Sequence, residues 1–294
     1  MGFPHCKPDR NDSLLGCSWH KLRPSGKKAV FKNLNYPDTS HTFMDIILLG
    51  HGSRRGKDTA LGLEEIRRRL QLKFDNGCRV RMAGLEFTPP SLEEAVLKLA
   101  EEGSKDIVIM PFFLFRGKHL KEEIPQDIDR VQSMTPQVSL RLIDNLGPDS
   151  RLMDLVEERL REFLPGSKNA GVILVRRGSR PEYDSGEELL ELAKDISRRT
   201  GFPVEPAQAQ FGYPTIAEAI QSLNMRSPDK IIVMPYLFFP GKVLYDNIIV
   251  DVNKARESYP HVEFCITSTL GVDDRLVDIA RDKIQNAEFK VEGV

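Results

Sequence analysis

The chain has 294 residues, of which 40% are hydrophobic and 29% charged, and this mixture excludes a fibrous, disordered or disulfide-rich protein. Its 42 basic and 43 acidic residues leave a net charge of −1, so no overall field draws it to nucleic acid or to a membrane surface. The longest apolar stretches span nine residues, whereas a membrane helix needs about 20, and four scattered cysteines fit a reducing, cytoplasmic compartment.

Residues 1–43 differ from the rest of the chain. They are polar, lack apolar periodicity and contain four prolines, with seven Lys or Arg against three Asp. This composition predicts a disordered leader. The leader has no apolar segment of the kind that forms a secretory signal, and its aspartates argue against a transit peptide. Met44, directly before the first apolar run, is an alternative start of the protein.

From Met44 onward, apolar runs alternate with amphipathic stretches, which is typical of βαβ units around parallel sheets. The runs predict strands near residues 45–50, 79–85, 107–113, 138–143, 171–176, 203–209, 230–237 and 262–267. The second four repeat the first four. Ile107–Pro111 matches Ile231–Pro235, and the segment that follows, Phe115–Leu120, matches Phe239–Leu244. We therefore expect an α/β protein built by internal duplication, with domains at 44–165 and 166–294.

The duplication serves as an internal control, because residues needed only for the fold should occur in both halves. Three positions differ in chemistry between the halves: His51 against Arg177, Glu86 against Gln210, and His119 against Val243. Each follows the carboxyl end of a predicted strand, and that edge of an open α/β sheet is where ligands bind. Imidazoles and carboxylates bind metals and move protons. The first half alone is thus predicted to hold a catalytic site of His51, Glu86 and His119.

Basic residues accompany this predicted site. Arg54, Arg116 and Lys118 belong to the same strand-end segments, and Arg177 reaches the equivalent edge of the second half. Such a rim suits a ligand with several carboxylates. We expect these four residues to bind substrate.

Three groups of motifs carry a resemblance to a known family. They are His-Gly-Ser-Arg at 51–54, Leu85-Glu86 followed by Pro90-Ser91, and Pro-Phe-Phe-Leu-Phe-Arg-Gly-Lys-His at 111–119 with Glu123-Ile-Pro125. Together they resemble the class II tetrapyrrole chelatases of the CbiX/SirB type, over residues 44 to about 290. The chain departs from the family at Glu123, where Asp is usual, and in lacking both histidines in the second half.

The resemblance implies two tandem chelatase-like (flavodoxin-like) domains, each with a four-stranded parallel sheet flanked by helices, in a monomer that acts as a pseudo-dimer. It implies insertion of a divalent metal into sirohydrochlorin, for cobalamin or siroheme biosynthesis, at one site per chain with His51 and His119 as metal ligands. The metal substrate that the resemblance favours most is Co²⁺, followed by Fe²⁺. Ni²⁺ also suits imidazole donors. The metal is a substrate, and no permanently bound cofactor is expected.

Two other classes of function stay open. A histidine phosphatase also places a histidine in a His-Gly turn after its first strand, but it has Arg directly before that histidine, where this chain has Gly50. A non-catalytic carrier of metal or tetrapyrrole would use the same ligands. Trapping of a phosphoenzyme at His51 would favour the first, and a single stoichiometric binding event would favour the second.

Overall fold

The computed structural model describes residues 44–52, 57–74, 77–86, 88–167, 169–180, 182–184 and 186–288. The predicted leader at 1–43 and the predicted substrate-binding residue Arg54 lie outside these ranges. Among the described residues, no helix is both long and apolar enough to cross a membrane.

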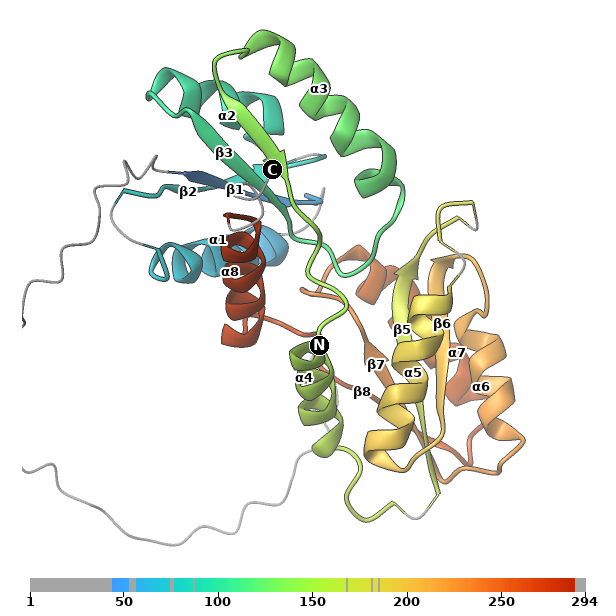
Figure 1. Ribbon diagram of the computed structural model, residues 1–294. Helices are drawn as coiled ribbons and strands as arrows, with labels where there is room; N and C mark the ends of the chain where they lie inside the picture. The colour runs from blue at the N-terminus through green and yellow to red at the C-terminus, as the bar shows by residue number, and fades with distance from the viewer. Residues whose placement is uncertain are drawn as a thin grey trace, which may run out of the picture. The chain divides into compact units, whose positions relative to one another are not determined.

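The first sheet is four-stranded and parallel, with the strand order β2-β1-β3-β4. Its strands are β1 (Asp45–Gly50), β2 (Val80–Gly84), β3 (Asp106–Pro111) and β4 (Ser139–Leu142). The helices between them are α1 (Lys57–Gln71), α2 (Leu92–Glu101), and a π-helical turn, η1 (His119–Glu123), that continues into α3 (Ile124–Met134). Figure 1 shows this sheet and its helices in blue to green.

The second sheet repeats the arrangement in the order β6-β5-β7-β8. Its strands are β5 (Ala170–Gly178), β6 (Val204–Phe211), β7 (Lys230–Pro235) and β8 (Glu263–Ile266). Its helices are α5 (Glu187–Thr200), α6 (Ile216–Asn224), the π-helical turn η2 (Val243–Ile248) and α7 (Ile249–Ser258). The predicted fold class, two four-stranded parallel sheets flanked by helices, is confirmed.

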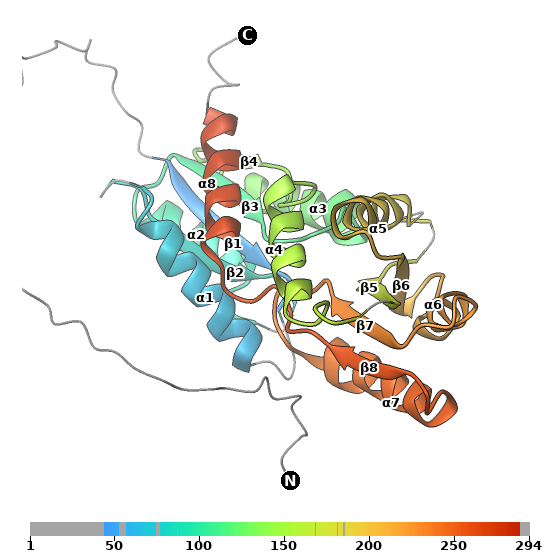
Figure 2. The same cartoon turned by 90° about the horizontal axis from the view of Figure 1, so that it is seen from below.

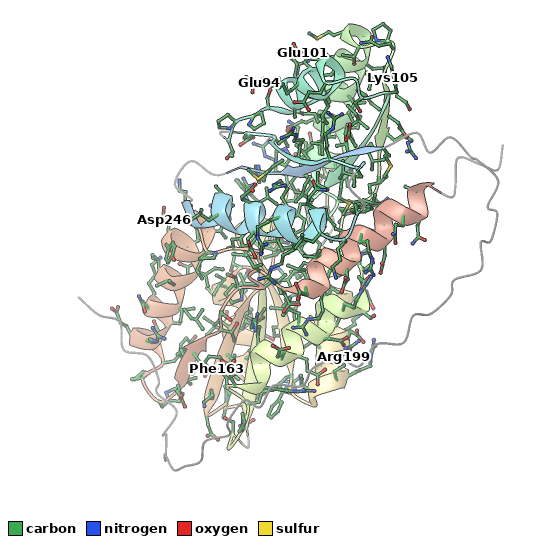
Figure 3. All side chains as sticks on the ribbon, turned by 90° about the vertical axis from the view of Figure 1, so that its left-hand side faces the viewer. Glu94, Glu101, Lys105, Phe163, Arg199 and Asp246 are labelled. Atoms are coloured by element: carbon green, nitrogen blue, oxygen red, sulfur yellow. The ribbon has the colours of Figure 1, made fainter. Side chains whose placement is uncertain are left out.

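The central strands are apolar because helices cover both of their faces. Every residue of β1 is buried, and Ile46 to Leu49 have no exposed surface. The sequences of strands that are buried on both faces are continuous apolar runs, without alternation of apolar and polar residues. On one face of the first sheet, Ile47 and Leu49 pack in a cluster with residues of α2 and α3. Figure 3 shows the labelled Glu94 and Glu101 of α2 on the outer side of this layer, away from α8.

The final helix of each repeat packs on the other repeat. Helix α4 (Ser150–Arg161) follows the first sheet in sequence but contacts α5 and β7. Helix α8 (Asp274–Glu288) follows the second sheet but contacts α1 and β3. The two exchanged helices also contact each other, and Figure 2 shows them side by side.

One apolar cluster therefore runs through both halves, with Leu48 and Leu174 from the two sheets and Leu155 and Ile279 from the exchanged helices. At the surface, Arg199 of α5, labelled in Figure 3, donates to Asp154 of α4 at 2.7 Å. A division of the chain at 165/166 remains our proposal for the repeat boundary. The hydrophobic core crosses that boundary.

Candidate active site

The carboxyl ends of strands from both sheets line one cleft of about 1050 Å³. Its apolar lining is rich in phenylalanine side chains: Phe112, Phe113, Phe115, Phe238 and Phe239. Polar and charged side chains enter from both halves, among them His51 and Glu86 from the first and Arg177 from the second. The cleft lies at the sheet edge where the sequence predicted the site.

A glycine turn brings the ends of β1 and β2 together. Gly52 has φ +84°, and a Cβ atom at this position would lie 1.7 Å from the carbonyl oxygen of Glu86. The backbone N–H of Glu86 donates to the carbonyl oxygen of His51 at 3.0 Å. Only glycine combines this left-handed backbone with so close an approach of a neighbouring chain. Gly52 thus fixes His51 beside Glu86.

His119 enters the cleft from the first residue of η1. The π-helical pattern is closed by the N–H of Ile124, which donates to the carbonyl oxygen of His119. Short π-helical segments are frequent at functional sites. The rings of His51 and His119 have centroids 4.6 Å apart, and the ring of Phe113 stacks on His119 at 6.4 Å.

The structure brings the three predicted catalytic side chains together. One potential ligand atom from each of His51, Glu86 and His119 lies within 4.8 Å of the other two. All three side chains are partly buried. Two imidazoles and a carboxylate at this spacing lie close enough for small side-chain movements to bring them around one borderline divalent ion.

Glu123 sets the orientation of His119. Its Oε2 atom lies 2.5 Å from Nδ1 of His119, and its Oε1 atom lies 3.0 Å from Nζ of Lys118. Burial opposes ionisation of Glu123, but the hydrogen bonds from His119 and Lys118 outweigh it and lower the pKa of the carboxyl. An ionised carboxylate only accepts hydrogen bonds, so Nδ1 of His119 is the donor in this contact and Nε2 is the ring nitrogen left for a metal ion.

His51 presents the same nitrogen by a different route. Its Nδ1 atom is buried and has no hydrogen-bond partner within the described ranges. Its Nε2 atom lies 2.5 Å from Nη1 of Arg177. Burial, followed by the positive charge of Arg177, lowers the pKa of His51 below its usual value of 6.5. The imidazole is therefore held neutral, which is the form that binds metals.

The predicted basic residues separate into different environments. Lys118 and Arg177 line the cleft, and Nζ of Lys118 lies 5.9 Å from the centre of the Tyr183 ring. Arg116 pairs instead with Asp144, and it is not among the described residues that line the cleft. The physical reason is local, because Asp144 follows β4 and offers a carboxylate to the Arg116 guanidinium.

Sequence reasoning missed two charged groups of the site. Glu123 was noted only as a departure from the family pattern, although its spacing of four residues from His119 places both on one side of a helical turn. The second group is a buried ion pair in the cleft wall, in which Nη1 of Arg176 lies 2.5 Å from Oδ2 of Asp184. No sequence pattern distinguishes this pair from surface charges.

A family model of known proteins matches this chain in both halves. The CbiX family model matches residues 45–163 and, a second time, residues 171–287. The chain belongs to the CbiX family.

Some relatives match most of this CbiX chain, and others match one repeat. "Sirohydrochlorin ferrochelatase" of Priestia megaterium is 27% identical over 263 residues, which cover 88% of this chain and 93% of the relative. The protein of the same name from Bacillus subtilis (strain 168) is 24% identical, with 84% and 93% covered. "Sirohydrochlorin cobaltochelatase" of Sulfurisphaera tokodaii is 29% identical over 124 residues, which cover 42% of this chain and 95% of the relative.

Solved structures share the fold of this CbiX protein. SirB from Bacillus subtilis with Fe³⁺ superimposes with a TM-score of 0.73 at 22% identity, covering 85% of this chain and 98% of that one. SirB from Bacillus subtilis subspecies spizizenii in complex with cobalt gives a TM-score of 0.70 at 21% identity, with 85% and 97% covered.

Proposed function

We propose that this protein is a metal chelatase that inserts a divalent metal ion into sirohydrochlorin. The observation that carries the proposal is the convergence of His51, Glu86 and His119 within 4.8 Å in the cleft of a CbiX-family chain. The names of relatives that match over most of the chain support the same substrate and reaction.

His51 and His119 hold the incoming metal ion. Glu123 leaves Nε2 of His119 free, and burial of Nδ1 leaves Nε2 of His51 as the nitrogen accessible from the cleft. Two neutral imidazoles bind Co²⁺, Fe²⁺ or Ni²⁺ while leaving other coordination positions to water. A metal that must be passed on needs such open positions, because the pyrrole nitrogens replace the departing ligands one by one.

Glu86 accepts protons from the ring. Insertion replaces two pyrrole N–H protons by M²⁺, so that sirohydrochlorin and M²⁺ give metallated sirohydrochlorin and two H⁺. The Glu86 side chain is partly buried beside both histidines, within reach of the same space as the metal. It takes a proton as each N–M bond forms and releases it to solvent through the open side of the cleft.

The cleft suits a flat, anionic tetrapyrrole. Its volume of about 1050 Å³ lies at the upper end of the range for ligand pockets, and phenylalanine rings offer apolar faces for the macrocycle. Lys118 and Arg177 reach the cleft and are placed to pair with substrate carboxylates. Arg54 and Arg116 remain candidates for binding the outer carboxylates of the substrate. Their positions in the sequence are the basis for this assignment.

We propose Fe²⁺ as the metal inserted in the cell and Co²⁺ as an accepted alternative. The sequence resemblance placed cobalt first, but relatives that match over most of this chain are named ferrochelatases, and the similar cobaltochelatase covers a single repeat. Ni²⁺ has support only from the chemistry of the donors. We further propose that the protein acts as a monomer in the cytoplasm, with its two halves acting as a pseudo-dimer.

An anaerobic absorbance assay tests the function. Purified protein is mixed with excess sirohydrochlorin and with Fe²⁺, Co²⁺ or Ni²⁺, and the spectrum of the metallated product is followed. We expect many turnovers per protein molecule, and near-complete loss in His51→Ala and His119→Ala with unchanged circular dichroism. Product limited to one equivalent would instead indicate a carrier. Full activity in either histidine variant would exclude the assigned ligands.

A further inference from the structure

In the described structure, a cation from the second half occupies the metal-binding nitrogen of His51. Nη1 of Arg177 lies 2.5 Å from Nε2 of His51. Because Nδ1 of His51 is buried, Nε2 is the nitrogen that an ion entering the cleft would reach. A guanidinium carries only donors and keeps its proton at any physiological pH, so Nε2 must be the acceptor in this contact.

The second half holds Arg177 in this position with residues that replace the metal site of the first half. Arg177 is the counterpart of His51, and its Nε atom donates to Oε1 of Gln210, the counterpart of Glu86, at 3.2 Å. Gln210 in turn donates to Oδ1 of Asn247 at 3.0 Å. The guanidinium also lies over the ring of Phe211, 6.0 Å from its centre. Arg177 is thus aimed across the cleft by a chain of contacts.

Arg177 and a metal ion exclude each other at His51. Nε2 has one lone pair, which either accepts a hydrogen bond from Arg177 or binds the metal. The two positive charges would also repel each other in a partly buried site, where screening by water is weak. On the basis of the proposed function, we propose that Arg177 is a displaceable internal cation that competes with the metal substrate for His51.

This competition has a use in metal insertion. A chelatase that bound its metal too tightly would retain the ion instead of passing it to the tetrapyrrole, since only binding that is stronger in the transition state speeds the transfer. Return of Arg177 to Nε2 as the metal departs replaces the lost metal–nitrogen bond with a charge-assisted hydrogen bond. The second half, without metal ligands of its own, thereby acts on the metal site of the first.

Titration of the full-length protein with Co²⁺ alone tests the proposal. The variant Arg177→Gln should bind Co²⁺ about ten- to a hundredfold more tightly than the wild type, which is the factor that corresponds to loss of one hydrogen bond from a charged group. The visible Co²⁺ spectrum at saturation should be the same in both proteins, because the ligands are unchanged. Unchanged or weaker binding in the variant would overturn the proposal.

Two further variants separate the causes. Lys242→Gln removes another positive charge from the cleft, and Lys242 has no hydrogen bond to His51 within the described ranges, so its Co²⁺ affinity should match the wild type. An equal gain of Co²⁺ affinity in Lys242→Gln would mean that general electrostatics, and not competition at His51, governs binding.

His51→Ala should lose Co²⁺ binding. If it binds normally, the proposed function fails, whereas its loss together with an unaffected Arg177→Gln refutes the competition alone. If Arg177→Gln does not fold, Arg177→Met gives the same test.

Discussion

The carboxylate of Glu123 lies 2.5 Å from Nδ1 of His119, one helical turn along the same π-helical segment. Metal-binding histidines commonly donate their second ring nitrogen to a carboxylate, which fixes the tautomer and the direction of the ring. Here the same carboxylate also holds Lys118, so one side chain positions a proposed metal ligand and a proposed substrate-binding group.

Replacing Glu123 should therefore weaken metal binding without removing a ligand. We expect Glu123→Ala to lose about 10- to 100-fold in Co²⁺ affinity, and Glu123→Gln to lose less because its amide oxygen still accepts from Nδ1. Isothermal titration with Co²⁺ measures both. The exposed neighbour Glu122 provides the control, since Glu122→Gln changes the same charge without touching His119. Equal effects at the two positions would mean that Glu123 acts only through its charge.

Gly52 gives a second prediction. A side chain at this position would both strain the left-handed backbone and clash with the neighbouring chain, and a second glycine lets these two effects be measured separately. In Gly52→Ala, the added Cβ meets the Glu86 carbonyl oxygen at 1.7 Å and must push the ends of β1 and β2 apart. We expect at least a tenfold loss of Co²⁺ affinity as His51 and Glu86 separate.

Gly103 supplies the matched control for that variant. It has φ +91°, but a Cβ there would meet nothing within 4 Å. Gly103→Ala should cost about 1–2 kcal/mol of unfolding free energy from the left-handed backbone alone and leave metal binding intact. Normal Co²⁺ binding in Gly52→Ala would show that the turn tolerates the clash and does not position the site.

The ion pair at the start of β1 gives a prediction about pH. The buried carboxylate of Asp45 accepts from the backbone N–H and from Nε of Arg79, both at 2.9 Å. Burial opposes ionisation, but hydrogen bonds from Arg79 and Ser104 outweigh it and lower the pKa of Asp45 below its usual value of 3.8. A group with a lowered folded pKa stabilises the protein above its unfolded pKa, and that stabilisation is lost as the pH falls through the folded pKa.

Asp45→Asn should accordingly lower the unfolding free energy at pH 7 by about 2–3 kcal/mol, the range for losing a hydrogen-bonded, buried ionic partner. The difference in unfolding free energy between the variant and the wild type should become smaller as the pH falls below about 4. Urea unfolding at pH 7, 5 and 3 measures it, with the exposed Glu101→Gln as the control. If this difference in unfolding free energy does not change with pH, the charge of Asp45 is not its cause.

The sequence predicted that His51, Glu86 and His119 lie close together because the carboxyl ends of parallel strands share one edge. His51 directly follows β1, Glu86 lies two residues beyond the end of β2, and His119 lies a few residues beyond β3, so topology alone brings them near one another. Comparison of the two repeats then indicated which strand-end residues are candidates for a catalytic role. Both inferences need only local patterns and the rules of α/β sheets.

Contacts between the halves could not be predicted in the same way. The pairing of Arg177 with His51 depends on how the two sheets face each other, which no local pattern encodes. Arg116 shows the same limit, since its ion pair with Asp144, beyond β4, could not be predicted from its place in the sequence, and its role in substrate binding stays a prediction. Amphipathic periodicity likewise reveals that α4 and α8 have apolar faces, without revealing which sheet each one covers.

The exchange of α4 and α8 leads to a last prediction, for the first half expressed alone as residues 44–165. In the whole chain, the buried face of α4 packs on the second half: Leu152, Met153, Leu155, Val156 and Leu160. The face of the first sheet that α4 leaves open is covered by α8. Burying each of these large side chains contributes about 1.5–3 kcal/mol, so a single copy of the first half would expose two complementary apolar surfaces.

Two copies can cover both surfaces by exchanging α4, and we expect residues 44–165 to form a dimer in light-scattering measurements. Leu155→Glu, which places a charge on the buried face of α4, should abolish the dimer. Arg161→Glu, on the exposed side of the same helix, should not. A folded, stable monomer of residues 44–165 would mean that α4 can turn back onto its own sheet, and that the exchange depends on the linked second half.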